Sequence, residues 1–163
     1  MHAFSFSQAY KVDEKRIYNY DDFNDIWVQN TTEQFAYANG GNKETSILGL
    51  AFPSGDNRYF CTKTYDANNN IMLSLKQNWN ATTMQWEDES RETYTYYAGT
   101  NNLKDVTTYS FSQGHDTFKI AYEYTGSDIT KITLQDGSSG TLVNYQEYVY
   151  TYNTPGLPAT EAD

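Results

Sequence analysis

Cysteine and histidine are scarce in this chain of 163 residues, which has one cysteine, Cys61, and two histidines, His2 and His115. A single cysteine excludes a disulfide within the chain, and a thiol in a strand-like segment is more often a small buried side chain than a nucleophile. No spacing of cysteine and histidine suits zinc. His115 lies in a Gly-His-Asp turn, which favours a surface position over a Ser-His-Asp triad. We therefore expect no metal, no cofactor and no catalysis.

Basic residues are also few, with 11 Lys and Arg against 21 Asp and Glu and a formal net charge of -10. The basic residues form no patch, so the phosphate backbone of a nucleic acid would be repelled. No apolar run approaches the about 18 residues that a membrane-spanning helix needs. The polar side chains of residues 85–93 also provide no lipid-compatible band for a strand. We expect neither a nucleic-acid partner nor a membrane-spanning chain.

Aromatic side chains are abundant, at 17% of the chain with 16 Tyr and 8 Phe, and they recur with the two-residue period of a strand. Two-residue alternation gives a strand one apolar face and one polar face. The clearest case is residues 117–125, where alternation predicts that one side carries Phe118, Ile120, Tyr122 and Tyr124. A core built largely from aromatic rings is the expected consequence.

Asn, Gly and Asp cluster between the apolar segments, as in turns that join antiparallel neighbours. The sequence predicts an all-β, single-domain antiparallel meander of about ten strands, closed as a twisted roll, a sandwich or a barrel. Residues 20–27 are the one candidate for a helical turn. The domain is expected over residues 1–152, with a flexible C-terminal tail at 153–163. The predicted strands are roughly 15–20, 33–38, 46–52, 58–65, 70–79, 84–97, 103–112, 117–125, 128–135 and 141–152.

A Tyr-x-Tyr or Lys-Thr-Tyr signature followed by a turn recurs along the chain, clearest over residues 58–152. The last tyrosines of the copies are 31, 28 and 26 residues apart, at Tyr65, Tyr96, Tyr124 and Tyr150. A near-constant period indicates that one supersecondary unit has been repeated. We interpret that unit as a β-hairpin.

One unit has a recognisable pattern. Residues 64–71 read Thr-Tyr-Asp-Ala-Asn-Asn-Asn-Ile and are followed by Gln-Asn-Trp-Asn at 77–80 and by Trp86. This pattern resembles the Tyr-Asp (YD-like) hairpin repeats of Bacteroidetes secreted proteins, and the chain is similar in kind to small Bacteroides secreted proteins of unknown function. Asn69 stands where the repeat usually has Gly, and the later copies lack the Asp after Tyr. The resemblance implies antiparallel hairpins and export, and it implies no catalysis.

Four aromatic residues are candidates for binding a ligand: Trp79, Trp86, Tyr97 and Tyr145. Two indoles at a sheet rim can stack on sugar rings, whereas the same pair can also hold a wide hairpin together through cross-strand contact. Alternation places Tyr97 and Tyr145 on the wet side of their strands, as either a contact surface or ordinary sheet tyrosines. The acids around Asp21 lack the glycine bend and distal Glu of a calcium loop, so we expect solvated turn acids.

These observations favour a non-catalytic module that is secreted, periplasmic or at the cell surface after removal of a signal peptide. Its expected role is to bind an unidentified protein or glycan, or to form part of an assembly. A carbohydrate-binding module that uses exposed aromatics is the first alternative. The second is an enzyme, a glycoside hydrolase with paired carboxylates, which the 21 acids allow without marking a pair. The oligomeric state stays open.

Overall fold

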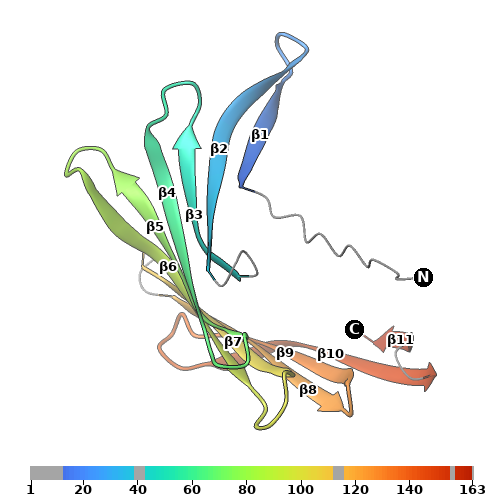
Figure 1. The fold of residues 1–163 in the computed structure, drawn as a ribbon. Helices are drawn as coiled ribbons and strands as arrows, with labels where there is room; N and C mark the ends of the chain where they lie inside the picture. The colour runs from blue at the N-terminus through green and yellow to red at the C-terminus, as the bar shows by residue number, and fades with distance from the viewer. Residues whose placement is uncertain (1–12, 39–42, 112–115, 155–156, 163) are drawn as a thin grey trace, which may run out of the picture. The chain divides into compact units, whose positions relative to one another are not determined.

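The computed structural model describes residues 13–38, 43–111, 116–154 and 157–162, and these ranges form an antiparallel sheet (Figure 1). His2, His115 and the predicted turn at 39–42 lie outside the described residues. The strands are β1 (Glu14–Asp21), β2 (Ile26–Ala38), β3 (Lys43–Ala51), β4 (Asn57–Tyr65), β5 (Ile71–Asn80), β6 (Gln85–Tyr96), β7 (Leu103–Ser110), β8 (Thr117–Thr125), β9 (Asp128–Asp136), β10 (Val143–Thr154) and β11 (Leu157–Ala162).

Strand order in the sheet follows the chain from β1 to β11, so each strand pairs with the next one along the sequence. This arrangement confirms the predicted all-β antiparallel meander, and because β1 and β11 each have one neighbour the sheet is open. No helix in the described ranges is long and apolar enough to cross a membrane.

The chain forms two compact units, one of residues 1–62 with 78–86 and one of residues 63–77 with 87–163. Strands β4, β5 and β6 contribute to both units. The prediction of one domain over residues 1–152 stays a prediction.

In the first unit, β2 pairs with β1 and β3, and β3 pairs with β4. Glu33, Gly49 and Tyr59 are direct partners across β2, β3 and β4, so their side chains lie on one side of the sheet. Gly49 is required there because the Tyr59 ring lies over it: a Cβ at Gly49 would be 2.4 Å from a ring carbon.

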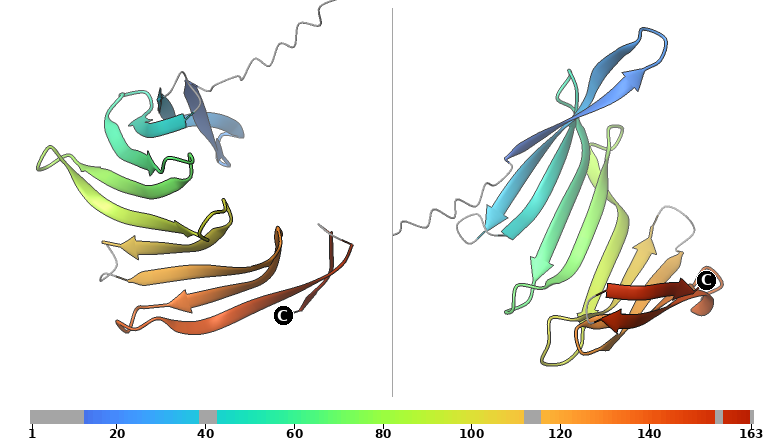
Figure 2. Two further views of the ribbon diagram at one scale, coloured as in Figure 1. Left: turned by 60° about the horizontal axis from the view of Figure 1, so that its bottom comes forward. Right: turned by 90° about the vertical axis from the view of Figure 1, so that its right-hand side faces the viewer.

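In the second unit, β6 to β10 form an antiparallel ladder with register shifts after Thr95, Glu123 and Asn144, and Figure 2 shows these strands from two further sides. Tyr94, Val106, Ile120 and Leu134 are partners across β6, β7, β8 and β9. β8 pairs with β9 without a shift from Phe118 to Glu123, and the residue inserted before Tyr124 lies in β9, between Ile129 and Lys131. β8 itself therefore alternates throughout, which confirms that its four alternate apolar residues share one side. Asn69, in the turn before β5, has a φ of 72°. Asn adopts this left-handed conformation more readily than most residues, so it can stand where a repeat usually has Gly.

Two strand predictions differ from the structure. β2 begins at Ile26 rather than near residue 33, and the candidate helical turn is a hairpin turn in which the Asp21 carboxylate accepts hydrogen bonds from the backbone N–H groups of Phe23 and Asn24. Beyond residue 152, where a flexible tail is expected, β11 pairs with β10. Pro158 and its neighbours gave no alternating apolar signal, so sequence patterning missed this backbone-paired strand.

Among the described residues, no apolar side chain is buried. The buried polar residues are Thr31, Asp105 and Thr133, at 5%, 8% and 8% exposure. The expected core of aromatic rings is therefore not closed within the described ranges. A sheet face without a second layer gives its side chains lateral neighbours only, which leaves their outer surfaces in contact with solvent.

Candidate functional site

Trp79 and Trp86 lie in the first unit, on either side of the turn between β5 and β6. Their ring centroids are 5.0 Å apart with the planes at 64°, and the Phe60 ring lies 5.7 Å from Trp86. The tilted indoles pack against each other, as expected of a cross-strand pair that holds a hairpin together. Trp79 also lines an open depression of about 550 Å³ with Gly55, Asp56, Asn57, Ala81 and Met84.

Tyr97 and Tyr145 lie in the second unit, near opposite ends of β8. Tyr97 packs edge-to-face on Tyr124, with centroids 5.9 Å apart, whereas Tyr145 lies 6.1 Å from Phe118. Phe118 and Tyr124 are six residues apart on one strand, or about 20 Å. Tyr145 is 56% exposed and sits at a register shift of β10. In the structure the side chains of Trp79 and Trp86 are in contact, whereas those of Tyr97 and Tyr145 are far apart. A ligand role for any of the four stays a prediction.

The second unit has an uncharged surface that we call the apolar face. Cross-strand register places its members on one side of β6 to β10. All are half-buried. The apolar face consists of Tyr94, Val106, Ile120, Tyr122, Ile132, Leu134 and Tyr148. Glu92 and Asp136 lie in the row beyond it, and the exposed Lys104, two residues from Val106, lies on the same side of β7, so charges border the face.

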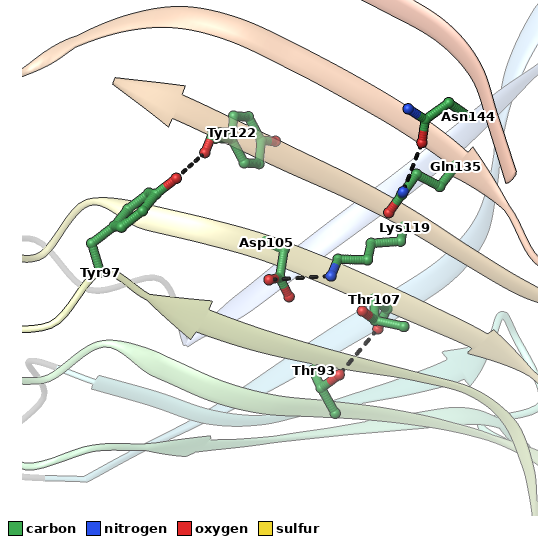
Figure 3. A network of polar contacts seen from close by, with 8 residues as sticks. All are labelled: Thr93, Tyr97, Asp105, Thr107, Lys119, Tyr122, Gln135 and Asn144. Atoms are coloured by element: carbon green, nitrogen blue, oxygen red, sulfur yellow. Dashed lines mark hydrogen bonds and ion pairs between the residues drawn. The ribbon is translucent and has the colours of Figure 1, made fainter. Parts of the chain in front are cut away.

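The opposite side of the same strands, the polar face, is crossed by hydrogen bonds and ion pairs (Figure 3). Lys119 Nζ lies 3.4 Å from Asp105 Oδ2, and Gln135 Nε2 donates to Asn144 Oδ1 at 2.8 Å. Lys131 Nζ lies 3.0 Å from Glu147 and 3.7 Å from Glu123, and the pKa of this lysine is raised, chiefly by its hydrogen bond to Glu147. Buried polar groups need such partners. The polar face therefore satisfies its own charges.

Tyrosine hydroxyls join strand ends in the second unit. Tyr96, at the end of β6, donates to the backbone oxygen of Ile71 at the start of β5 over 3.0 Å. Tyr152, near the end of β10, donates in the same way to Ile129 at the start of β9 over 2.5 Å. Two hairpins thus use the same tyrosine-to-isoleucine bond, a feature that sequence reasoning missed. The signal was present, because both pairs are formed by a Tyr-x-Tyr segment and the Ile that follows a turn.

Three turns of the second unit are connected at one end of the sheet. Asn70 Nδ2 donates to Asn101 Oδ1 at 3.2 Å, and Asn102 Nδ2 donates to the backbone oxygen of Gly126 at 3.2 Å. Beside these turns lies an open depression of about 620 Å³, lined by Tyr97, Thr100, Asn102, Glu123 and Tyr124. We call it the turn depression.

A polar cluster occupies one side of the first unit. The Tyr59 hydroxyl donates to Glu33 Oε1, and Lys15 Nζ lies 3.2 Å from the other oxygen of that carboxylate. Burial, followed by the bond to Glu33, raises the pKa of Tyr59 well above its ordinary value. Arg58 donates to Thr31 Oγ1 at 2.7 Å and to Asn30 Oδ1. Because a phenol with a raised pKa ionises less readily, Tyr59 is suited to hold β2 and β4 together rather than to transfer a proton.

Carboxylates are spread over the two units. Within the described ranges, no group of three or more His, Cys, Asp or Glu side chains could hold a metal ion. Asp21 binds Asn24 through both carboxylate oxygens, which lowers the pKa of Asp21. The depression at Trp79 is lined by one carboxylate, Asp56, and the turn depression by one, Glu123. The glycosidase alternative needs two, so neither lining presents the expected pair.

No family model and no curated protein sequence matches the chain. Among solved structures, the chain is similar to a Bacteroides fragilis protein of unknown function, with a TM-score of 0.51, 15% identity and coverage of 76% of this chain and 94% of that one. A DUF3836 family protein from Parabacteroides distasonis matches with a TM-score of 0.37 and 11% identity, and the match covers 70% of this chain and 91% of that one. A DUF3836 family protein from Bacteroides vulgatus matches with a TM-score of 0.28 and 19% identity, and the match covers 72% of this chain and 89% of that one. The first match shows a shared fold, in line with the expected likeness to small Bacteroides proteins of unknown function, whereas the relation to Tyr-Asp repeats stays a prediction.

Proposed function

We propose that this chain is a non-catalytic, exported module that forms an assembly with a second copy of itself through the apolar face of β6 to β10. The observation that carries the proposal is that none of the described apolar side chains is buried. An apolar sheet face gains free energy when another layer covers it, at about 25 cal/mol per Å² of apolar surface. A face of seven half-buried Tyr, Ile, Leu and Val side chains is therefore a favourable contact surface.

The dimensions of the apolar face fit a weak, reversible contact with a second copy. Its two rows of side chains, about 6.6 Å apart along five strands that are about 4.8 Å apart, cover about 300 Å². Two such faces together bury about 600 Å², the size of a weak, transient contact rather than of a permanent interface. Two sheets packed face to face at about 10 Å form a sandwich, the expected way for a one-sided sheet to cover its apolar side.

Charge distribution also supports this pairing. The lysine–carboxylate pairs at Lys119 and Lys131 lie on the polar face. In a face-to-face pair these charges stay in solvent, away from the contact. Export rests on the resemblance of residues 62–97 to hairpin repeats of secreted proteins, and cell fractionation of the natural host tests it.

Analytical ultracentrifugation over a hundredfold range of concentration tests the assembly. We expect a reversible dimer, and Ile120→Glu, which places a charge in the centre of the apolar face, should raise its dissociation constant at least about a hundredfold. Val149→Glu is the matched control: Val149 is 46% exposed and pairs with Lys131 on the polar side. A wild-type chain that stays monomeric at every concentration contradicts the proposal. So does a folded Ile120→Glu variant, checked by circular dichroism, that dimerises like wild type.

A further inference from the structure

We propose that the turn depression binds a neutral saccharide. This inference does not depend on self-association, because none of the residues that line the depression belongs to the apolar face. Its five lining residues come from the turn between β6 and β7 and from the end of β8. A volume of about 620 Å³ falls within the range of small-ligand sites.

The aromatic rings of the depression are held in place before any ligand arrives. Tyr97 reaches past β7, and its hydroxyl donates to the backbone oxygen of Tyr122 on β8 at 2.7 Å (Figure 3). Its ring meets Tyr124 at an interplanar angle of 85°. Rings fixed in this way lose little conformational entropy on binding, which favours affinity. A ring face offers a flat apolar surface for the C–H face of a sugar.

The turn itself is also ordered by hydrogen bonds. Thr100 Oγ1 donates to the backbone oxygen of Tyr97 at 3.0 Å and accepts from the backbone N–H of Asn102 at 3.1 Å. Asn102 uses its amide nitrogen on Gly126, which orients the carboxamide and leaves its oxygen as an acceptor. These bonds give the polar wall of the depression a defined geometry.

Two acceptors and one hydroxyl remain available to a ligand. They are the Asn102 carboxamide oxygen, the Glu123 carboxylate and the Tyr124 hydroxyl, to which no described residue hydrogen-bonds. The Glu123 side chain is 62% exposed and 3.7 Å from Lys131 Nζ, so its second oxygen can accept from solvent or ligand. A carboxylate accepts two hydrogen bonds at once, which suits adjacent hydroxyl groups.

This combination selects the class of ligand. Acceptors beside an aromatic ring match a molecule with hydroxyl donors and an apolar face, as in a neutral sugar. Glu123 and the net charge of -10 disfavour phosphates, sulfates and uronic acids. Because the lining has one carboxylate, Glu123, the site lacks the second group that glycoside hydrolysis requires, and binding without cleavage follows.

Nuclear magnetic resonance tests the assignment on the full chain, by titration with maltose, cellobiose, lactose and mannobiose, each to about 20 mM. We expect saturable shifts of the Tyr97, Asn102 and Glu123 amides with at least one of these sugars, and none with digalacturonate. No saturable shift with any of the four sugars overturns the inference. Shifts confined to the Trp79 indole overturn it as well, because they move the sugar to the depression at β5 and β6.

Variants separate a site from a non-specific surface effect. Glu123→Ala should weaken binding about tenfold, because a charge-assisted hydrogen bond is lost. Glu147→Ala is the matched control, since Glu147 also pairs with Lys131 but does not line the depression. Equal effects of the two substitutions, or an unchanged affinity in Glu123→Ala, overturn the assignment. Both glutamates are exposed, and an unchanged amide spectrum away from the substitution verifies that each variant is folded.

Discussion

The Tyr59 ring covers Gly49, its direct partner on the neighbouring strand, and leaves no room for a side chain there. The ring position is set by the hydrogen bond from its hydroxyl to Glu33 on β2, one strand further along. The Tyr59 side chain on β4 thus passes over Gly49 on β3 and bonds to Glu33 on β2, so that one tyrosine links three strands. A glycine in a strand interior usually costs stability, so its presence at position 49 has a packing reason.

Gly49→Ala should lower the free energy of unfolding by about 1–3 kcal/mol, because the added Cβ would lie 2.4–2.7 Å from three Tyr59 ring atoms. In a Tyr59→Ala background the same substitution should have the opposite sign and add about 0.5–1 kcal/mol, since Ala is the better strand residue once the ring is gone. Urea denaturation of the four proteins measures both effects. An equal effect of Gly49→Ala in the two backgrounds would show that the ring is not the cause.

Tyr96→Phe and Tyr152→Phe should each lower the free energy of unfolding by about 1 kcal/mol, because each removes a hydroxyl that donates to a backbone oxygen, of Ile71 or Ile129. The ring and its packing stay. Tyr145→Phe is the control, as Tyr145 is 56% exposed. Thermal and urea unfolding of the three variants compare them directly, and losses no larger than that of the control would rule out the shared strand-end bond.

Trp86→Ala should lower the free energy of unfolding by about 2–3 kcal/mol, because Trp86 contacts both Trp79 and Phe60. Trp27→Ala provides the comparison: that indole is 69% exposed and has Tyr20 as its ring neighbour. Its loss should be under about 1 kcal/mol. Similar losses at the two positions would indicate that the trio of rings adds no packing energy of its own.

Alkaline pH should destabilise the fold through Tyr59 and Tyr94. Burial, followed by a hydrogen bond to Glu33 or Glu92, raises the pKa of both phenols above the unfolded value of about 10. Above that unfolded pKa the folded state holds protons that the unfolded state has lost, so stability is complete below about pH 10 and falls as pH rises further.

The Tyr59→Phe/Tyr94→Phe double variant should show a smaller loss of unfolding free energy than wild type between about pH 9 and about pH 11. Urea midpoints across this range measure the loss, and the ultraviolet absorbance of the phenolates follows the ionisation itself. An equally steep decline in the double variant would contradict a role for these two tyrosines.

Local patterning predicted the strands well where alternation is regular. The predicted strands 117–125 and 128–135 agree closely with β8 and β9. The turn that joins them contains Gly126, whose φ of 66° suits a glycine, so the turn was recognisable from the sequence. Alternation failed at the start of β2, where the exposed residues 26–28 are all apolar. It also failed at β11, a strand that its pairing with β10 reveals.

The candidate sites also differ in how far the sequence revealed them. Trp79 and Trp86 were recognisable as a hairpin pair because they flank one turn, and a short connection places its two ends side by side. The turn depression was only half recognisable: Tyr97 was a candidate, whereas Glu123 and Tyr124 lie more than 20 residues away and reach it through the order of β6, β7 and β8.

The order of residues along the chain determined the strands, the repeated tyrosines and the division of each strand into an apolar and a polar side, because these depend on neighbours one or two residues apart. Register decided the rest. It placed Asp105 opposite Ala121 beside Lys119, set Tyr59 over Gly49, and left the apolar face open among the described residues. A shift of one residue between strands would exchange the two sides of the sheet, and the energy that prevents it comes from contacts between distant segments.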